Sequence, residues 1–346
     1  MNKESVIDFE ALYNSMNKCK RGVIWKDSVA YYDLHSIEQT LKLERELKNG
    51  TYKAKPPKTF TITHPKKRTA VSIAFRDRVY QRSLNDNVIY LCMTKPFIHQ
   101  NFACQKDKGT DLARDTLSKY MHRAFMHYGK DFYVLQCDIK GYYPNMNHDV
   151  TEKMFRKYLP EDIYIMVESI LHHQYTEEIG YNPGSQMIQI AGISMLNPLD
   201  HMIKEKLHMK LYMRYMDDYI SMHPNEDYLE ECKAKISEHL AKSHFELNET
   251  KTNIYPVKEG IKFLGFTHRL TDTGKVIRII NHENVRAERK KLRRMVNLAI
   301  NGEISRDKVD ECFKSWKDHA SKGNSFKLIK RMDAYYEDLW RNYGSV

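Results

Sequence analysis

Two adjacent aspartates, Asp217 and Asp218, lie in the middle of an aromatic and methionine-rich run, "LYMRYMDDYISM" at 211–222. Aspartate is a poor strand residue, and neighbouring carboxylates repel one another at neutral pH. A hairpin turn between two apolar strands accommodates the pair, and a turn alone would explain it without any function. The apolar flanks keep the pair close to a buried sheet, however, where a divalent cation such as Mg²⁺ best explains both carboxylates.

Asp138 is the candidate for a third carboxylate, supplied by a different strand. It ends an apolar run in "YVLQCDIKGYY" and is followed by a turn that contains glycine. Two strand ends that carry carboxylates can hold two Mg²⁺ ions, and such a pair stabilises both the attacking and the leaving oxygen of a phosphoryl displacement. Asp138, Asp217 and Asp218 therefore predict a two-metal phosphoryl-transfer centre. For Asp138 alone, the alternative is a strand-end cap or a turn aspartate.

The segments that must position these carboxylates mix helical and β patterns. Helical spacing occurs in five stretches, namely 5–49, 76–95, 149–172, 193–210 and 282 onward. A hairpin is expected over 58–75 around a Pro-Lys-Lys turn, and two strands over 260–280 around "TDTG". Residues 132–147 are expected to begin as a short buried strand and to end in a loop. The mixture of helices and antiparallel strands predicts an α+β fold.

Charge and cysteine usage narrow the class of protein. The 346 residues suffice for two or three lobes, and 56 Lys+Arg against 45 Asp+Glu give a net charge of +11. This surplus favours nucleic acid as a partner, with a protein that is merely basic as the alternative. The six cysteines are widely spaced without a C-x-x-C pair, which argues against a zinc ribbon or a disulfide scaffold and fits a reducing cytosol. The charged start and the lack of a long apolar run predict a cytoplasmic protein without a membrane partner.

Five further sequence blocks accompany "DIKGYY" and "YMDD" in a definite order along the chain. They are "HPKKRTAVSIAFRDRVYQRSL" (64–84), "FIHQNFACQKDKGT" (97–110), "PGSQMIQ" (183–189), "LNETKTNIY" (247–255) and "IKFLGF" (261–266). As a set, these blocks resemble those of bacterial reverse transcriptases of the group II intron, diversity-generating retroelement and antiphage-defence types. The resemblance covers about residues 45–270.

The resemblance implies a right-hand polymerase fold with fingers, palm and a small helical thumb. Fingers with an N-terminal helical extension are expected over 1–130, including the 58–75 hairpin. The palm, with the catalytic carboxylates and the primer grip, is expected over 131–280, and part of 150–210 is expected to pack with the fingers. A helical thumb is expected over 281–346.

The same resemblance assigns the catalytic residues. Asp138 and Asp217 are expected to be the metal ligands, and Asp218 the supporting or second-metal carboxylate, with two Mg²⁺ ions as cofactors and Mn²⁺ as a substitute. Lys251 corresponds to the lysine that protonates departing pyrophosphate, where negative charge builds up. The alternative for Lys251 is a solvated lysine in a polar loop.

The residues expected to bind the incoming dNTP are Lys67, Arg68, Arg78, Ile139, Tyr143 and Gln189. Cations at a hairpin tip can close on a triphosphate, although Arg78 has the alternative of an ion pair with Asp77 or a helix neighbour. Tyr143 stands where the family places an aromatic ring under the incoming sugar, which rejects a 2′-hydroxyl. The alternative for Tyr143 is core packing, because Tyr142 beside it is an equal candidate for that role.

The residues expected to contact template or primer are Gly184, Lys108, Phe263, Leu264, Gly265, Arg286, Lys290, Arg293 and Arg294. The last four belong to "RAERKKLRR" (286–294), which is expected to follow the backbone of an RNA–DNA duplex; a solvated basic helix is the alternative. A plain basic turn is the alternative for Lys108. Two residues depart from the family pattern, since Ile188 replaces a serine and Pro183 replaces a glutamine in the block that holds the template.

These expectations converge on an RNA-directed DNA polymerase that adds dNTPs to a primer 3′ end by two-metal phosphoryl transfer. Its expected partners are an RNA template or a noncoding RNA, a DNA primer and product, dNTPs, and an accessory protein or further copies of the chain. The departures at Pro183 and Ile188 favour an antiphage-defence enzyme with a dedicated structured RNA. The alternatives are a retroelement enzyme with an accessory protein, a template-independent or protein-primed nucleotidyltransferase, and an RNA-binding module without catalysis.

Overall fold

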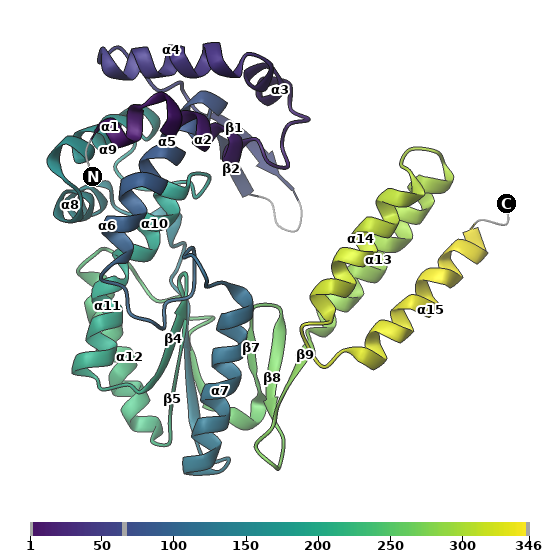
Figure 1. The fold of residues 1–346 in the computed structure, drawn as a ribbon. Helices are drawn as coiled ribbons and strands as arrows, with labels where there is room; N and C mark the ends of the chain where they lie inside the picture. The colour runs from purple at the N-terminus through teal and green to yellow at the C-terminus, as the bar shows by residue number, and fades with distance from the viewer. Residues whose placement is uncertain (1–2, 64–67, 344–346) are drawn as a thin grey trace. The chain divides into compact units, whose positions relative to one another are not determined.

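The computed structural model describes residues 3–63 and 68–343 of the chain (Figure 1). They form two compact units, the first built from Met1–Asp107, Cys137–Tyr219 and Cys232–Thr252 and the second from Lys108–Gln136, Ile220–Glu231 and Asn253–Val346. Within the described ranges, no helix is both long enough and apolar enough to cross a membrane.

Helices make up most of the first unit. They are α1 (Glu4–Ile7), α2 (Phe9–Cys19), α3 (Asp27–Leu34), α4 (Ser36–Lys48), α5 (Phe75–Leu84), the π-helical η1 (Asn85–Ile89), α6 (Tyr90–Thr94), α8 (His148–Tyr158), α9 (Glu161–Gln174), α10 (Gln186–Met195), α11 (Asn197–His201) and the π-helical η3 (Met202–Lys206). Helix α10 is mostly apolar and largely buried, with Gln186 and Gln189 on its more exposed side, and it packs against α5, α6 and α8. A mostly apolar helix is typical of a core position.

The hairpin expected over 58–75 is present in the first unit. Strand β1 (Lys58–Ile62) pairs antiparallel with β2 (Arg68–Ser72), in a register that places Phe60 opposite Ala70. The predicted tip residue Lys67 lies outside the described residues. This prediction succeeded because two runs of alternating β-forming residues, close together in the sequence, are a local signal.

A four-stranded sheet carries the segments with the aspartates. Its strands are β3 (Tyr133–Cys137), β4 (Leu211–Tyr215), β5 (Asp218–His223) and β6 (Asn253–Pro256), in the order β4-β5-β3-β6. Strand β3 runs antiparallel to β6, with Val134 opposite Tyr255. Strands β4 and β5 are buried along most of their length, which explains their aromatic and methionine-rich composition.

The second unit contains a three-stranded antiparallel sheet in the order β7-β8-β9. Its strands are β7 (Ile261–Phe263), β8 (Phe266–Leu270) and β9 (Val276–Ile280). The predicted "TDTG" turn joins β8 to β9, but the expectation of only two strands was wrong. Leu264 and Gly265 have φ of 44° and 89°, and this left-handed backbone ends β7 in a tight turn before β8 begins.

The remaining helices of the chain are α7 (Thr110–Tyr128), α12 (Glu226–Ala241), α13 (His282–Ile300), α14 (Arg306–Ala320) and α15 (Phe326–Tyr343), with short 3-10 helices η2 (Tyr143–Asn145) and η4 (Val257–Glu259). Helices α13, α14 and α15 lie side by side (Figure 1) around a core that includes Leu292, Val309, Phe313 and Met332. Antiparallel strands and helices together confirm the predicted α+β class. The boundaries 1–130, 131–280 and 281–346 stay a prediction.

Candidate active site

Asp138 follows directly after β3, where the strand passes into an isolated bridge between Ile139 and Leu247. That bridge brings in the segment before β6, whose side chains reach the Asp138 carboxylate. Asn248 Nδ2 donates to Asp138 Oδ2 at 3.0 Å, and Lys251 Nζ lies 2.9 Å from the same oxygen. Backbone bonds secure the contact, because Asn248 N donates to Asp138 O at 2.8 Å. Asp138 therefore lies at the end of its strand, as predicted, and contacts the segment that carries Lys251.

The two neighbouring aspartates occupy different places in a β4–β5 hairpin. Met216, with φ of 57°, and Asp217 form the turn, whereas Asp218 is the first residue of β5. A positive φ at a two-residue turn matches the twist of the flanking strands. Both aspartate side chains are half-buried. The hairpin thus presents the Asp217 carboxylate beside the sheet rather than in open solvent.

Asp138, Asp217 and Lys251 share one electrostatic environment. Burial raises the pKa of Asp217 above its usual value, and the negative charge of Asp138 raises it further, while Lys251 and Arg214 lower it. The hydrogen bond to Asp138 raises the pKa of Lys251, and the charges of Asp138, Asp217 and Asp218 add to this effect. The Asp138 side chain is 20% exposed and that of Lys251 60%. The three predicted carboxylates therefore act together on one ammonium group.

The donor chemistry of this group fits a divalent cation. Carboxylate oxygens are the ligands that Mg²⁺ prefers. Burial, and to a smaller extent the charge of Asp138, raise the pKa of Asp217, and a bound cation would stabilise its ionised form. In residues 3–63 and 68–343, however, no three His, Cys, Asp or Glu side chains are grouped as a ready metal cage. The assignment of Asp138, Asp217 and Asp218 as metal ligands stays a prediction.

A buried ion pair that sequence reasoning missed supports the β4–β5 hairpin. Arg214 and Asp200 have wholly buried side chains and make two bonds, Nε to Oδ1 at 2.7 Å and Nη2 to Oδ2 at 2.6 Å. The Arg214 guanidinium also donates to the carbonyl of Met216 at 2.8 Å and to that of Ile193 at 3.0 Å. The turn that carries Asp217 is therefore tied to α10 and α11 through one side chain. The signal in the sequence was a charged residue inside each of two apolar runs.

Tyr142 and Tyr143 follow the Asp138 strand end and have different environments. Tyr142 is 4% exposed and packs against Phe245 with ring centroids 4.9 Å apart. Tyr143 is half-buried, and its hydroxyl has no hydrogen-bond partner in the described part of the chain. Burial raises the pKa of Tyr143, with smaller contributions from Cys104 and Asp217. The ring of Tyr143 thus lies near the turn formed by Met216 and Asp217, and Tyr142 is the buried one of the pair.

The segment 183–189, which leads into α10, contacts Cys104 and strand β2. Gln189 on α10 donates from Nε2 to the carbonyl of Pro183 at 2.9 Å, and its Oε1 lies 3.8 Å from the Cys104 thiol. Cys104 Sγ also lies 3.7 Å from Sδ of Met216, which forms the β4–β5 turn with Asp217. Gly184 precedes the helix, and a Cβ there would lie 3.2 Å from the carbonyl of Val71 in β2. Gly184 therefore lies beside strand β2 of the β1–β2 hairpin, and Gln189 is linked to this segment through Pro183.

Three of the other residues predicted to bind dNTP, namely Ile139, Arg78 and Arg68, lie on different elements of the structure. Ile139 has a side chain only 1% exposed, which leaves its backbone for any contact with a nucleotide. Arg78 lies on α5 beside Cys19, whose thiol has its pKa raised to about 11 by burial despite the opposing charges of Arg82 and Arg78. Arg68 begins β2. Asp77, the alternative partner for Arg78, instead accepts a hydrogen bond from Tyr52 Oη at 2.8 Å.

The predicted primer grip is the β7–β8 turn of the second unit. Phe263 ends β7 with its side chain buried, and the carbonyl of Leu264 accepts a bond from Arg114 Nη1 at 3.0 Å. Gly265 is required by its φ of 89° and by His319, which lies 3.1 Å from where a Cβ would be. Sequence reasoning missed Arg114, a buried cation that braces the turn. Lys108, a further predicted contact, stands just before α7.

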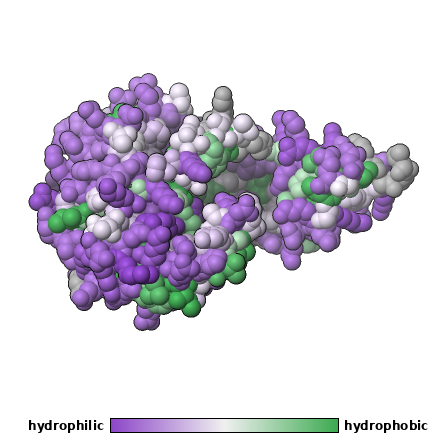
Figure 2. Space-filling view, turned by 90° about the horizontal axis from the view of Figure 1, so that it is seen from above, coloured by the Kyte–Doolittle hydropathy of each residue, from purple (hydrophilic) through white to green (hydrophobic). Residues whose placement is uncertain are grey.

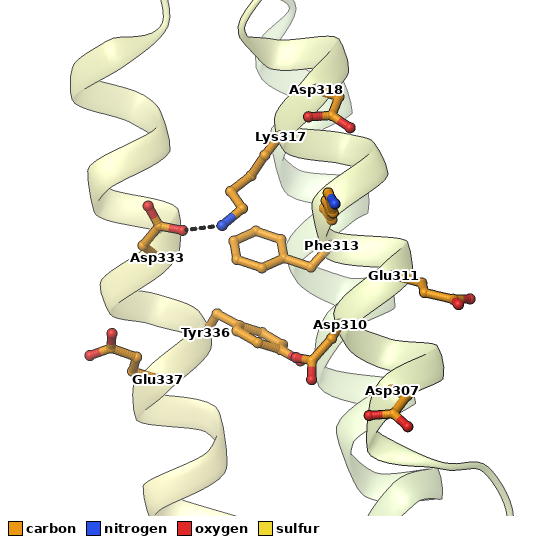
Figure 3. Close-up of a pocket in the computed structure, with 10 residues that line it drawn as sticks. Asp307, Asp310, Glu311, Phe313, Lys317, Asp318, Asp333, Tyr336 and Glu337 are labelled. Carbon is orange, nitrogen blue, oxygen red and sulfur yellow. Dashed lines mark hydrogen bonds and ion pairs between the residues drawn. The ribbon is translucent and has the colours of Figure 1, made fainter.

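The three C-terminal helices carry a basic run on α13 and a groove rich in acidic residues between α14 and α15. Arg286, Lys290, Arg293 and Arg294 are exposed on α13. Helices α14 and α15 line a groove of about 930 Å³, in which six acidic side chains outnumber Lys314 and Lys317; the acids are Asp307, Asp310, Glu311, Asp318, Asp333 and Glu337. In Figure 3, Lys317 reaches Asp333 across this groove, 3.0 Å away, above the rings of Phe313 and Tyr336. Phosphate is repelled by such a groove, so nucleic acid is expected on α13.

Hydrophilic residues cover most of the face drawn in Figure 2, with hydrophobic residues confined to smaller areas. This surface agrees with the charged composition of the chain, of which 29% is Asp, Glu, Lys or Arg.

Comparisons with known proteins bear on the family. A family model described as "Reverse transcriptase (RNA-dependent DNA polymerase)" matches residues 53–268, well over half of the chain. No curated protein matches. Among solved structures, the chain is similar to telomerase from Candida albicans in complex with a fragment of telomeric RNA, at 11% identity and a TM-score of 0.49, over 90% of this chain and 66% of that one.

Two further similar structures are telomerases from Candida tropicalis without ligand. One, truncated of its C-terminal domain, has 15% identity and a TM-score of 0.48, over 70% of this chain and 60% of that one. The other has 14% identity and a TM-score of 0.49, over 86% and 64%. The chain thus spans less than two thirds of the length of each of these telomerase chains.

The family match includes Asp138, the β4–β5 hairpin, Lys251 and the β7–β8 turn. The match and these elements agree, and the chain belongs to the reverse transcriptase (RNA-dependent DNA polymerase) family.

Proposed function

We propose that this chain is an RNA-directed DNA polymerase that adds dNTPs to the 3′ end of a primer. The observation that carries the proposal is the ion pair between Lys251 Nζ and Asp138 Oδ2 at 2.9 Å, within the electrostatic reach of Asp217. A non-catalytic RNA-binding module has no need for carboxylates collected from separate segments, since their mutual repulsion is unfavourable. The family match to residues 53–268 supports the same reaction.

In this proposal, Asp138, Asp217 and Asp218 would hold two Mg²⁺ ions. Such ions, when bound, neutralise charge on the attacking and leaving oxygens. The primer 3′-hydroxyl loses its proton to solvent and its oxygen forms a bond to the α-phosphorus of the dNTP, while the bond from that phosphorus to the pyrophosphate oxygen breaks. Lys251 donates a proton to the departing pyrophosphate. A lysine already carries this proton at neutral pH, and the bond to Asp138, which raises the pKa of Lys251, stabilises the protonated form further.

Selection of the sugar is assigned to Tyr143, whose half-buried ring lies near the catalytic turn. A ring under C2′ of the incoming nucleotide leaves no room for a 2′-hydroxyl. Replacing it, as in Tyr143→Val, is expected to admit ribonucleotides in a primer-extension assay with competing rNTP. Unchanged discrimination between dNTP and rNTP would remove Tyr143 from this role.

The nucleic-acid partners are assigned to both units. Lys67, Arg68, Arg78, Ile139 and Gln189 are proposed to contact the dNTP, and Gly184, Lys108, Phe263, Leu264 and Gly265 the template and primer strands. The exposed cations of α13, namely Arg286, Lys290, Arg293 and Arg294, are proposed to follow the phosphate backbone of the duplex. Their exposure, together with a net charge of +11, supports this assignment.

Primer extension on an RNA template with dNTPs and Mg²⁺ tests the proposed activity. The double variant Asp217→Ala/Asp218→Ala is expected to lose incorporation, whereas Asp227→Ala, at an exposed aspartate of α12, retains it. Incorporation that survives the double substitution would overturn the mechanism. Extension of DNA without any template, or a tyrosine linked to the product, would favour a template-independent or protein-primed nucleotidyltransferase.

For the biological role, we propose action in antiphage defence together with a dedicated structured RNA. Pro183 and Ile188, which depart from the family's template-holding block, favour this role over a mobile intron. The alternative is a diversity-generating retroelement enzyme that copies a template repeat with an accessory protein. Sequencing the nucleic acid that copurifies with the chain separates the two, because a repeat from a variable gene supports the alternative and a dedicated noncoding RNA supports defence.

A further inference from the structure

We propose that Gly192 is a positioning residue for binding of the incoming nucleotide, because it sets the position of the Tyr143 ring. The inference rests on the proposed function, in which this ring lies under the incoming sugar. Gly192 is in the interior of α10 and is buried. Glycine is unfavourable inside a helix relative to alanine, so a close approach by a neighbour is the physical reason to look for at this position.

The neighbour is the Tyr143 ring. A Cβ added at Gly192 would lie 2.8 Å from Tyr143 Oη and 3.0 Å from both Cε1 and Cζ. Carbon atoms that are not bonded to each other pack at about 3.5–4.0 Å, so one methyl group at this position cannot coexist with the present ring position. The ring of Tyr143 is therefore seated directly on the backbone of α10.

Neither backbone has room to retreat. The carbonyl of Tyr143 accepts a bond from Tyr181 N at 2.9 Å, and Gly180 N donates to the carbonyl of Met146 at 2.8 Å. Tyr142 Oη donates to the carbonyl of Gly192 itself. On the other side, α10 packs against α5, α6 and α8. A methyl group at Gly192 would thus be accommodated by rotation of the Tyr143 ring rather than by separation of the two segments.

The surroundings of the ring favour rotation toward the Asp217 turn. The Tyr142 ring borders it on one side, with ring centroids 5.4 Å apart. Cys104, which with Asp217 contributes to the raised pKa of Tyr143, lies 3.7 Å from Met216 of that turn. Pushing the ring away from Gly192 moves it toward the turn formed by Met216 and Asp217, where the nucleotide is proposed to bind. Side chains forced about 30° from a rotamer cost about 0.5–1.5 kcal/mol. The result is a ring that occupies part of the nucleotide site and is harder to displace.

The effect of Gly192→Ala is therefore opposite to that of Tyr143→Ala. We expect Gly192→Ala to raise KM for dNTP roughly three- to tenfold, to leave kcat within about twofold and to keep the discrimination against rNTP. Tyr143→Ala is expected to admit rNTP. In the double variant Tyr143→Ala/Gly192→Ala, the KM increase caused by the methyl group disappears, because there is no ring to displace.

The test is steady-state primer extension with dNTP and rNTP for the wild type, the two single variants and the double variant. Tyr142→Phe is the control, because it removes the bond to the Gly192 carbonyl without adding atoms next to Tyr143. Tyr143→Phe combined with Gly192→Ala is expected to give an intermediate KM, since the closest contact is to Oη. An unchanged KM in Gly192→Ala, or an increase that persists in the double variant, overturns the inference.

Folding of each variant is checked by thermal unfolding. If Gly192→Ala fails to fold while the double variant folds, the conflict is with the Tyr143 ring and the inference holds. If both fail to fold, the methyl group conflicts with another part of the core and the inference is wrong. Absence of any incorporation by the wild type would instead refute the proposed function, which separates the two outcomes.

Discussion

Removing the carboxylate of Asp200 is expected to damage both stability and catalysis through Arg214. Both side chains are wholly buried and are joined at 2.6 and 2.7 Å. Breaking a buried ion pair by removing one partner costs about 3–5 kcal/mol, because an uncompensated charge stays inside the protein. Asp200→Asn preserves the shape of the side chain, so its effect isolates the charge. We expect the free energy of unfolding to fall by this amount.

A triple replacement separates stability from positioning. Asp200→Leu, Tyr212→Phe and Arg214→Met together remove the ion pair and the Tyr212 hydroxyl, which donates to Asp200 Oδ1 at 2.5 Å. Apolar replacement of a whole buried pair is often neutral or stabilising. The carbonyls of Met216 and Ile193 are deprived of a donor, which costs roughly 1–3 kcal/mol for each buried group left without a partner. Stability should therefore return in part, whereas nucleotide addition should stay low because nothing braces the Asp217 turn.

Urea unfolding and primer extension are measured on the same preparations. The matched control is Arg156→Met, because Arg156 pairs with Glu161 at 3.3 Å through side chains that are both more than half exposed. Such surface pairs contribute about 0–1 kcal/mol. The reasoning is refuted if Asp200→Asn costs no more than the control. Full activity in the triple variant would show that Arg214 does not position the turn.

Three further outcomes are expected. Lys251→Met should lower the rate of nucleotide addition by roughly 10²–10⁴ without weakening RNA–DNA binding, and a rate close to that of the wild type would exclude Lys251 as the proton donor. Arg293→Ala/Arg294→Ala should reduce the slope of log binding constant against log salt concentration for duplex binding by about one unit for each phosphate that is no longer neutralised. Lys308→Ala on α14 should leave this slope unchanged. Burial, and then the charge of Arg278, lower the pKa of His268 to about 4, so protonation favours the unfolded chain. Stability should then fall by about 2 kcal/mol between pH 7 and pH 5, and His268→Leu should abolish this component of the pH dependence in urea unfolding.

Local signals predicted the elements that carry the candidate site. Alternating β-forming residues around a turn predicted the β1–β2 hairpin, and an aspartate pair between apolar runs predicted the β4–β5 hairpin. Both signals depend on residues within a few positions of one another. The third strand of the β7-β8-β9 sheet was missed because Gly265 was not taken as the end of a strand, although glycine inside a strand often marks such a break.

Contacts between distant segments could not be predicted in this way. Arg214 and Asp200 each interrupt an apolar run, which signals that each needs a partner, but only the fold shows that they satisfy one another. Gly192 looks like an ordinary helix glycine until the Tyr143 ring is placed against it. Asn248, which shares Asp138 Oδ2 with Lys251, lay in a recognised block but had no individual signal.

The junction between Asp138 and Lys251 joins residues 113 positions apart in the chain. During synthesis, all three aspartates leave the ribosome well before the segment that supplies Asn248 and Lys251. A nascent chain that ends near residue 240 therefore contains every carboxylate of the centre but neither of these two donors. Contacts of such high sequence separation form late and slowly in folding. The proposed centre should thus gain its full set of donors only after residue 251 has been made and has reached Asp138.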